Sequence, residues 1–185
     1  MNKKSSAFDL KMPRAAGAAF GKVLSNMVRR IKRGSLDGKI LRMVIVVSRF
    51  HLIVTQRLLL GALDGLRRCG VQRANIEIVW TPGAFEIPQV ALRIASAKRA
   101  PHAIICLGAV IRGETPHFDY ICSEAARGIS RVGMKSGIPT IFGVLTTDTQ
   151  NQALARAGGK HGNKGWDAAM TAVEMFNLFR QVRER

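Results

Sequence analysis

Short apolar runs alternate with amphipathic stretches along most of this chain. Four runs rich in aliphatic residues predict buried strands, at residues 39–48, 76–80, 102–111 and 139–145. Between and after them, apolar residues recur at helical spacing, which predicts helices over residues 52–69, 85–98, 118–136, 150–157 and 166–183. Strands that alternate with helices favour an α/β fold, with a parallel four-stranded sheet between two layers of helices and right-handed crossovers.

The first 38 residues differ in composition from the rest. They hold nine Lys or Arg residues against two Asp residues, within a net charge of +17 over 185 residues. Apolar residues between Phe20 and Ile31 recur among basic ones, which predicts a short basic amphipathic helix. Three interpretations fit: a solvated, partly disordered extension, an organellar transit peptide, and a basic tail that binds RNA or a protein partner. We therefore treat residues 1–38 as an N-terminal extension and residues 39–185 as the folded domain, and we expect residues 1–36 to be dispensable for folding.

Length and composition exclude several classes of protein. A chain of 185 residues with 47% hydrophobic residues suits one domain with an aliphatic core. No apolar run reaches the roughly 18 residues that span a bilayer, so we expect no membrane span. Cys69, Cys106 and Cys122 are too far apart for a metal knuckle, and an odd count favours reduced thiols in an intracellular protein. We expect no structural metal, and a cytoplasmic location unless residues 1–38 direct the chain to an organelle.

Three loops with chemically useful side chains follow three of the predicted strands, at residues 48–51, 81–86 and 112–117. Because the carboxyl ends of parallel strands meet at one edge of a sheet, we expect these loops to converge on one crevice, where open α/β sheets bind ligands. The third loop contains Gly113, Thr115 and His117, which together supply backbone N–H groups, a hydroxyl and a group that titrates near neutral pH. It predicts an anion site beside a proton-transfer residue, although a polar connection without function has the same composition.

In combination these motifs resemble the lumazine synthase family. The matching segments are residues 49–50, 82–88, 107–119, 139–147 and 162–165, in the family's order and spacing. The resemblance implies a flavodoxin-like three-layer sandwich. It also implies the condensation of 5-amino-6-(D-ribitylamino)uracil with 3,4-dihydroxy-2-butanone 4-phosphate in riboflavin biosynthesis, which yields 6,7-dimethyl-8-ribityllumazine, phosphate and water. The implied enzyme is a transferase that needs no metal and no organic cofactor.

The resemblance also assigns roles to residues of this chain. His117 is implied as the catalytic residue that transfers protons. The ribitylaminouracil is implied to bind Phe50, Ala84, Phe85, Glu86, Ala109, Val110, Ile111 and Phe142. The butanone phosphate is implied to bind Glu114, Thr115 and Arg156. Phe142 and Arg156 are implied to come from a neighbouring subunit, with Lys160 and Asp167 in support of the phosphate site. His51 stands where Asn is common in the family, which we interpret as variation at the edge of the site.

Assembly in the family implies partners as well. Lumazine synthases form pentamers, and many build hollow icosahedral 60-mers, with riboflavin synthase as a candidate guest. The positive charge of this chain also favours non-specific contact with polyanions through residues 1–38. Two other functions stay open: a flavodoxin-like domain that binds a nucleotide phosphate without chemistry, and a nucleic-acid-binding shell, which is compatible with the enzyme.

Overall fold

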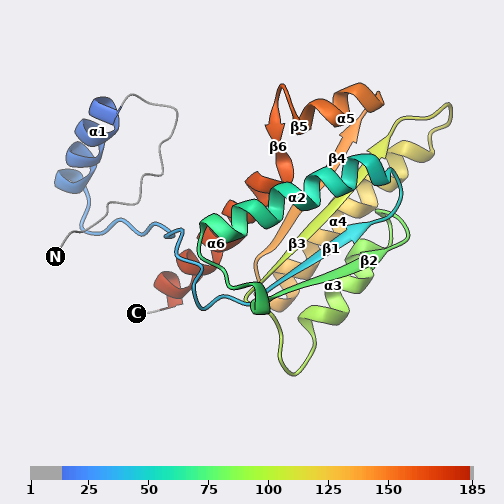
Figure 1. Ribbon diagram of the computed structural model, residues 1–185. Coiled ribbons are helices and arrows are strands. Elements are labelled where there is room, and N and C mark those ends of the chain that lie inside the picture. Colours follow the sequence, from blue (N-terminus) through green and yellow to red (C-terminus); the bar gives the residue numbers. More distant parts are fainter. Residues whose placement is uncertain (1–13, 184–185) are drawn as a thin grey trace.

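A parallel sheet of four strands lies between two layers of helices in the computed structural model, which describes residues 14–183 (Figure 1). The strands are β1 (Met43–Ser48), β2 (Ile76–Thr81), β3 (Ala103–Ile111) and β4 (Thr140–Thr147). Their order in the sheet is β2-β1-β3-β4, so the chain crosses over after each strand. The predicted α/β class and the flavodoxin-like arrangement are confirmed.

Helices follow the strands as the apolar periodicity predicts. They are α2 (Leu52–Arg68), α3 (Ile87–Ala95), α4 (His117–Ser136), α5 (Gln150–Arg156) and α6 (Lys164–Arg183), and a short 3-10 helix η1 (Arg73–Asn75) precedes β2. The predicted stops at Gly70 and Gly137 are confirmed, since both glycines have the positive φ that ends a helix, 83° and 69°. The helix α3 is shorter than predicted at both ends. Pro88 must lie in the first turn of a helix, so α3 starts close to it, and Ser96 is the C-cap residue.

The centre of the sheet is the most buried part of the molecule. Every residue of β1 is buried, and so is all of β3 except Ile111. Both strands have a strand on either side and helices on both faces, so their side chains are apolar except at Ser48, the last residue of β1. Alternate residues point to opposite faces: Ile45 packs with α2 and α6, and Val46 packs with α3 and α4. The edge strand β2 instead leaves Ile78 and Trp80 exposed.

The basic N-terminal extension contains the predicted helix, but the helix ends earlier than the apolar pattern does. The helix α1 spans Arg14–Met27 and lies apart from the sheet (Figure 1), whereas the pattern continues to Ile31. The alanines before Phe20 favour a helix, and the four cations between residues 29 and 33 repel one another at helical spacing. Residues 1–13 of the extension lie outside the described residues.

Residues 33–37, here called the docking segment, run along α6. Three of their backbone oxygens accept hydrogen bonds from two amide side chains of that helix. The bonds run from Gln181 to Arg33 (2.6 Å) and from Asn177 to Ser35 (2.8 Å) and Asp37 (3.0 Å). The change in composition at residue 38 therefore comes after the chain has reached the folded body. The division at this residue stays a prediction.

The glycine-rich segment before α6 is more ordered than a simple link. It contains an antiparallel hairpin of β5 (Ala157–Gly159) and β6 (Gly162–Asn163). The Asn163 side chain donates to the Arg57 oxygen (2.8 Å) and accepts from the Gly165 N–H (2.8 Å), so it joins the hairpin to α2 and to the start of α6. A Cβ at Gly165 would collide with the backbone of Leu58, so only glycine permits this approach of the two helices.

Candidate active site

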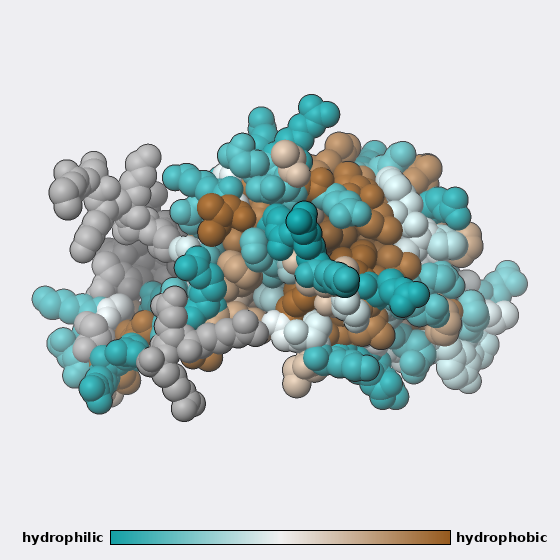
Figure 2. All heavy atoms as spheres, turned by 90° about the horizontal axis from the view of Figure 1, so that it is seen from below, coloured by the Kyte–Doolittle hydropathy of each residue, from teal (hydrophilic) through white to brown (hydrophobic). Residues whose placement is uncertain are grey.

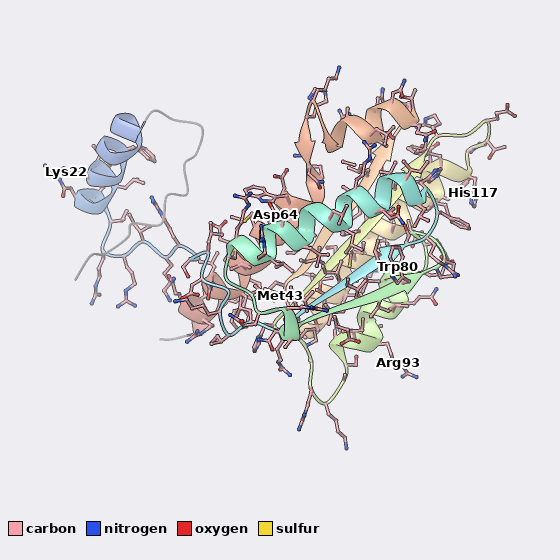
Figure 3. The ribbon with its side chains drawn as sticks, in the orientation of Figure 1. Lys22, Met43, Asp64, Trp80, Arg93 and His117 are labelled. Atoms are coloured by element: carbon pink, nitrogen blue, oxygen red, sulfur yellow. The ribbon has the colours of Figure 1, made fainter. Side chains whose placement is uncertain are left out.

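The three predicted loops meet at the carboxyl ends of β1, β2 and β3 and enclose a hollow of about 660 Å³, here called the aromatic hollow. In Figure 3 His117 lies at this end of the sheet, and Met43 lies at the opposite end. Nine of the twelve predicted site residues line the hollow: Phe50, Ala84, Phe85, Glu86, Ala109, Val110, Ile111, Thr115 and His117. The walls also contain residues that the sequence analysis did not assign to the site, among them Phe118, Tyr120 and Ile121. The loops therefore build one shared site.

The exposed Phe50 ring lies close to the loop after β2. A Cβ at Gly83 would come within 2.9 Å of that ring, so glycine lets the loop and the ring approach without a shift of the ring. The Gly83 N–H donates to Oε2 of Glu86 at 2.9 Å. This bond uses one carboxylate oxygen of Glu86 and holds the loop in shape. The second oxygen can accept a hydrogen bond from a ligand hydroxyl.

His51 also lines the aromatic hollow, and its backbone is unusual. With φ 57° and ψ 46° it is left-handed, and it directly precedes α2. Asn adopts this conformation more readily than most residues, which gives a physical reason for the Asn common at this position. The interpretation of His51 as tolerated variation stays a prediction.

The loop after β3 presents alternate residues to the hollow. Gly113 and Thr115 line it, and Glu114 between them does not. His117 is the first residue of α4 and is exposed. The N-terminus of a helix carries a partial positive charge and free N–H groups. A phosphate at this loop could therefore meet the Thr115 hydroxyl and backbone N–H groups without facing the Glu114 carboxylate.

Arg156 lies elsewhere, in a second hollow of about 640 Å³ at α5 and the β5–β6 hairpin, here called the cationic hollow. Its basic lining residues are Arg57, Arg156, Lys160 and His161. Arg156 is half-buried, and its Nη1 donates to the Gln152 oxygen at 3.0 Å. Within the described residues the two hollows share no lining residue. Arg156 of one chain therefore does not reach the aromatic hollow of the same chain.

Two further expected residues lie outside both hollows. Phe142 is on the edge strand β4, with 44% of its surface exposed. Asp167, expected to support the phosphate site, instead forms an ion pair with Lys164 at 2.7 Å. Asp167 therefore belongs to the first turn of α6 rather than to the cationic cluster.

The three cysteines are reduced and protonated. Cys69, Cys106 and Cys122 are free thiols, and burial raises the pKa of each, so they are protonated at neutral pH. Across residues 14–183 no group of three or more His, Cys, Asp or Glu side chains could hold a metal ion. Nor does any helix in this range have the length and hydrophobicity to cross a bilayer.

This arrangement defines a flavodoxin-like α/β protein with an open hollow at the carboxyl end of its sheet. The family model for 6,7-dimethyl-8-ribityllumazine synthase matches residues 40–180. The chain therefore belongs to the lumazine synthase family, and it is a transferase of riboflavin biosynthesis that acts on small molecules. The family resemblance drawn from the motifs is confirmed, and the whole N-terminal extension, residues 1–38, lies before the matched range.

Proposed function

We propose that this protein condenses 5-amino-6-(D-ribitylamino)uracil with 3,4-dihydroxy-2-butanone 4-phosphate. One observation carries the proposal: three loops distant in sequence bring nine expected residues into one hollow in a chain of this family. The hollow combines an aromatic ring, an apolar floor, a carboxylate and a histidine beside a helix N-terminus. These groups suit a flat heterocycle with a polyhydroxylated chain and a phosphorylated ketone.

The ribitylaminouracil occupies the aromatic part of the hollow in this proposal. Phe50 stacks on the pyrimidine ring, because an aromatic face binds a flat ring with little loss of conformational entropy. The end of β3, from Ala109 to Ile111, forms the floor beneath the ring. Ala84, Phe85 and the Glu86 carboxylate hold the ribityl chain, and the bond from Gly83 keeps that carboxylate in place.

The butanone phosphate binds at the loop before α4. Backbone N–H groups at Glu114 and Thr115 and the Thr115 hydroxyl donate to the phosphate oxygens. The charge is balanced by Arg156 of a neighbouring subunit, whose planar fork can bond two phosphate oxygens at once. Phe142 of that neighbour closes the pyrimidine side.

The reaction proceeds by imine formation between the amine and the ketone, phosphate elimination, ring closure and dehydration. Juxtaposition of the two substrates supplies much of the rate enhancement, since it replaces a bimolecular encounter. His117 lines the same hollow as Thr115 and the end of β3, where it can carry protons between the reacting groups. Such a proton transfer contributes roughly 100-fold or more.

A site shared between subunits requires an oligomer, and the surface supports one. Large apolar side chains are exposed on both edge strands, on α2 and on α3: Leu52, Ile53, Leu60, Ile78, Trp80, Leu92 and Phe142. Figure 2, which views the molecule from below Figure 1, shows hydrophobic residues gathered between hydrophilic ones. Exposed apolar patches of this kind mark interfaces. We propose a homopentamer, alone or within a 60-mer shell that can enclose riboflavin synthase, and native mass measurement distinguishes these states.

The activity test uses assembled protein treated with a chelator, both substrates and no added metal. The expected result is lumazine absorbance that rises together with released phosphate in a one-to-one ratio. The Phe50→Ala variant is the matched control and is expected to be much slower. Assembled wild-type protein that forms no lumazine contradicts the proposal.

We further propose that residues 1–38 contact polyanions. The observation is their charge, nine Lys or Arg residues against two Asp residues, and each phosphate contact by Lys or Arg releases bound counterions. Heparin or RNA retention should therefore depend less steeply on salt after removal of residues 1–31, which spares the docking segment. An unchanged salt dependence contradicts this role.

A further inference from the structure

One arginine beside the aromatic hollow has no role in the reaction proposed above. Arg112 follows the last residue of β3, and its N–H donates to the Thr147 oxygen at 2.9 Å, which extends the pairing of β3 with β4 by one residue. It also begins the loop that runs through Gly113 and Thr115 to His117. Its position is therefore set by the centre of the sheet, the most buried part of the molecule.

The Arg112 side chain joins this strand end to two other elements. Its guanidinium donates to Asp119 in the first turn of α4 at 3.2 and 3.4 Å, and to Asp148 after β4 at 2.9 Å. The guanidinium carbon also lies 4.1 Å from the centroid of the Phe118 ring. One planar side chain thus holds β3, α4 and the start of the β4–α5 connection together.

Arg112 and the residues of α4 that it contacts lie on either side of the catalytic His117 in the sequence. Phe118 and Asp119 directly follow His117, and all three lie in the first turn of α4. Arg112 therefore fixes both ends of the loop, one end through its own backbone and the other through its side chain. These contacts hold the two ends of the loop, and with them the backbone on either side of Thr115 and His117, against the sheet.

The same geometry separates Arg112 from a phosphate ligand. Its donors point to two carboxylates, and Arg112 is absent from the lining of the aromatic hollow. Its ion pairs are also open to solvent, since 43% of the Arg112 side chain and 60% and 66% of its two partners are exposed. Exposed ion pairs of this kind contribute little to stability. Their effect is on position.

We propose that Arg112, with Asp119 and Asp148, is a positioning clamp that holds His117 and the phosphate loop in the reactive arrangement. The clamp rests on the proposed condensation for its consequence in catalysis, but its mechanical effect can be measured independently. Lys keeps the charge of Arg but lacks the planar fork that bonds both carboxylates. Geometry rather than charge should therefore decide the outcome.

The test compares Arg112→Lys and Arg112→Ala with Arg127→Ala, an exposed arginine of α4 that pairs with Glu124 away from the loop. Both Arg112 variants should lower kcat by up to about 100-fold, the cost of a misplacement near 1 Å. The midpoint of thermal unfolding should stay nearly constant, and Arg127→Ala should match the wild type. In a His117→Gln background at saturating butanone phosphate, Arg112→Lys should cost little further kcat, because His117, through which the clamp acts on kcat, is already absent; its action on the phosphate loop should remain as a higher KM for the butanone phosphate.

Hydrogen exchange gives a readout that needs no substrate. Amides of residues 113–120 should exchange faster in both Arg112 variants than in the wild type and in Arg127→Ala. Unchanged exchange, or losses of kcat that multiply in the double variant, overturns the clamp. An inactive wild type refutes the proposed reaction instead, and hydrogen exchange then decides the clamp alone.

Discussion

The two ends of the sheet use their polar groups differently. At the carboxyl end, the Thr115 hydroxyl and the His117 imidazole face an open hollow. At the amino end, polar groups are paired within the chain. His102 Nδ1 accepts the Arg42 N–H at 2.9 Å, the His102 N–H donates to the Arg42 oxygen at 2.8 Å, and Asn177 donates to the docking segment. These polar groups at the carboxyl end are available to a ligand, whereas those at the amino end stabilise the fold.

This difference predicts a separation of effects. Substitutions of exposed residues at the carboxyl end, such as Phe50 and His117, should change activity and leave stability nearly constant, because these side chains bury little surface in the free subunit. Substitutions at the amino end should change stability and leave activity nearly constant. A residue that changes both equally would show that the two ends are coupled through the sheet.

The largest effect is expected at Arg156, which we propose completes the site of a neighbouring chain. Arg156→Ala removes a charge-assisted contact with phosphate, so the KM for the butanone phosphate should rise roughly 10- to 100-fold while that for the uracil substrate changes little. The matched control is Arg67→Ala, since Arg67 is an exposed arginine in the last turn of α2 that pairs with Asp64. Equal losses for both substrates would contradict a phosphate role.

Mixed oligomers test whether the site is shared. At a butanone phosphate concentration well below the wild-type KM, Phe50→Ala and Arg156→Ala subunits should each be slow, and co-assembly should restore part of the activity. Recovery occurs because some interfaces then combine an intact Phe50 with an intact Arg156. No recovery in verified mixed oligomers would place the whole site within one chain.

His117→Gln tests the chemistry of the carboxyl end alone. The kcat should fall by about 100-fold, since only assisted proton transfer is lost, while juxtaposition of the substrates persists. The KM values and the midpoint of thermal unfolding should change little. A loss as complete as that seen for a missing covalent nucleophile would show that His117 does more than move protons.

At the amino end, Asn177→Ala tests the docking segment. It removes two hydrogen bonds to backbone oxygens, so the free energy of unfolding should fall by about 1–3 kcal/mol while kcat stays constant. Thr171→Ala on the same helix is the control, because it removes one exposed bond within α6.

Two deletions locate the same effect along the chain. Removal of residues 1–31 should leave the unfolding midpoint unchanged, and removal of residues 1–37 should lower it. The expectation from sequence that residues 1–36 are dispensable is thus narrowed to residues 1–31. Equal midpoints for both deletions would show that the docking segment is peripheral.

The sequence predicted the carboxyl end better than the amino end, for a physical reason. A ligand site needs particular side chains, so Phe50, Glu86 and His117 leave a recognisable pattern. The docking segment is held through its backbone oxygens, which every residue possesses, and the only side-chain signal is two amides four residues apart on α6. No motif could reveal it.

The clamp and the cationic hollow could not be predicted, because the residues that form them are far apart in the sequence. The clamp joins Arg112 to Asp148, and the cationic hollow joins Arg57 to His161, across long stretches of chain. Such pairs become visible only when the crossovers are placed. The fold itself was predictable, because uninterrupted aliphatic runs such as residues 43–47 can be buried only in the middle of a sheet with helices on both faces.

The smallest expected effect is a pH dependence at the amino end. Partial burial, and then the positive charges of Arg42 and Arg180, lower the pKa of His102 below its usual 6.5. The neutral ring also accepts the Arg42 N–H and packs on Phe176, with ring centroids 4.7 Å apart.

A lowered pKa in the folded state means that the unfolded chain binds the proton more readily. The contribution of His102 to stability is therefore complete above pH 6.5 and is lost as the pH falls through the lowered pKa. His102→Asn keeps an acceptor for the Arg42 N–H but cannot titrate. At pH values below 6.5, the midpoint of thermal unfolding, measured at fixed protein concentration, should decrease slightly more for the wild type than for His102→Asn. Lumazine formation at neutral pH should be the same for both proteins. Parallel midpoint curves would show that the acid sensitivity belongs to other groups, and a change in activity would show that the two ends of the sheet are coupled.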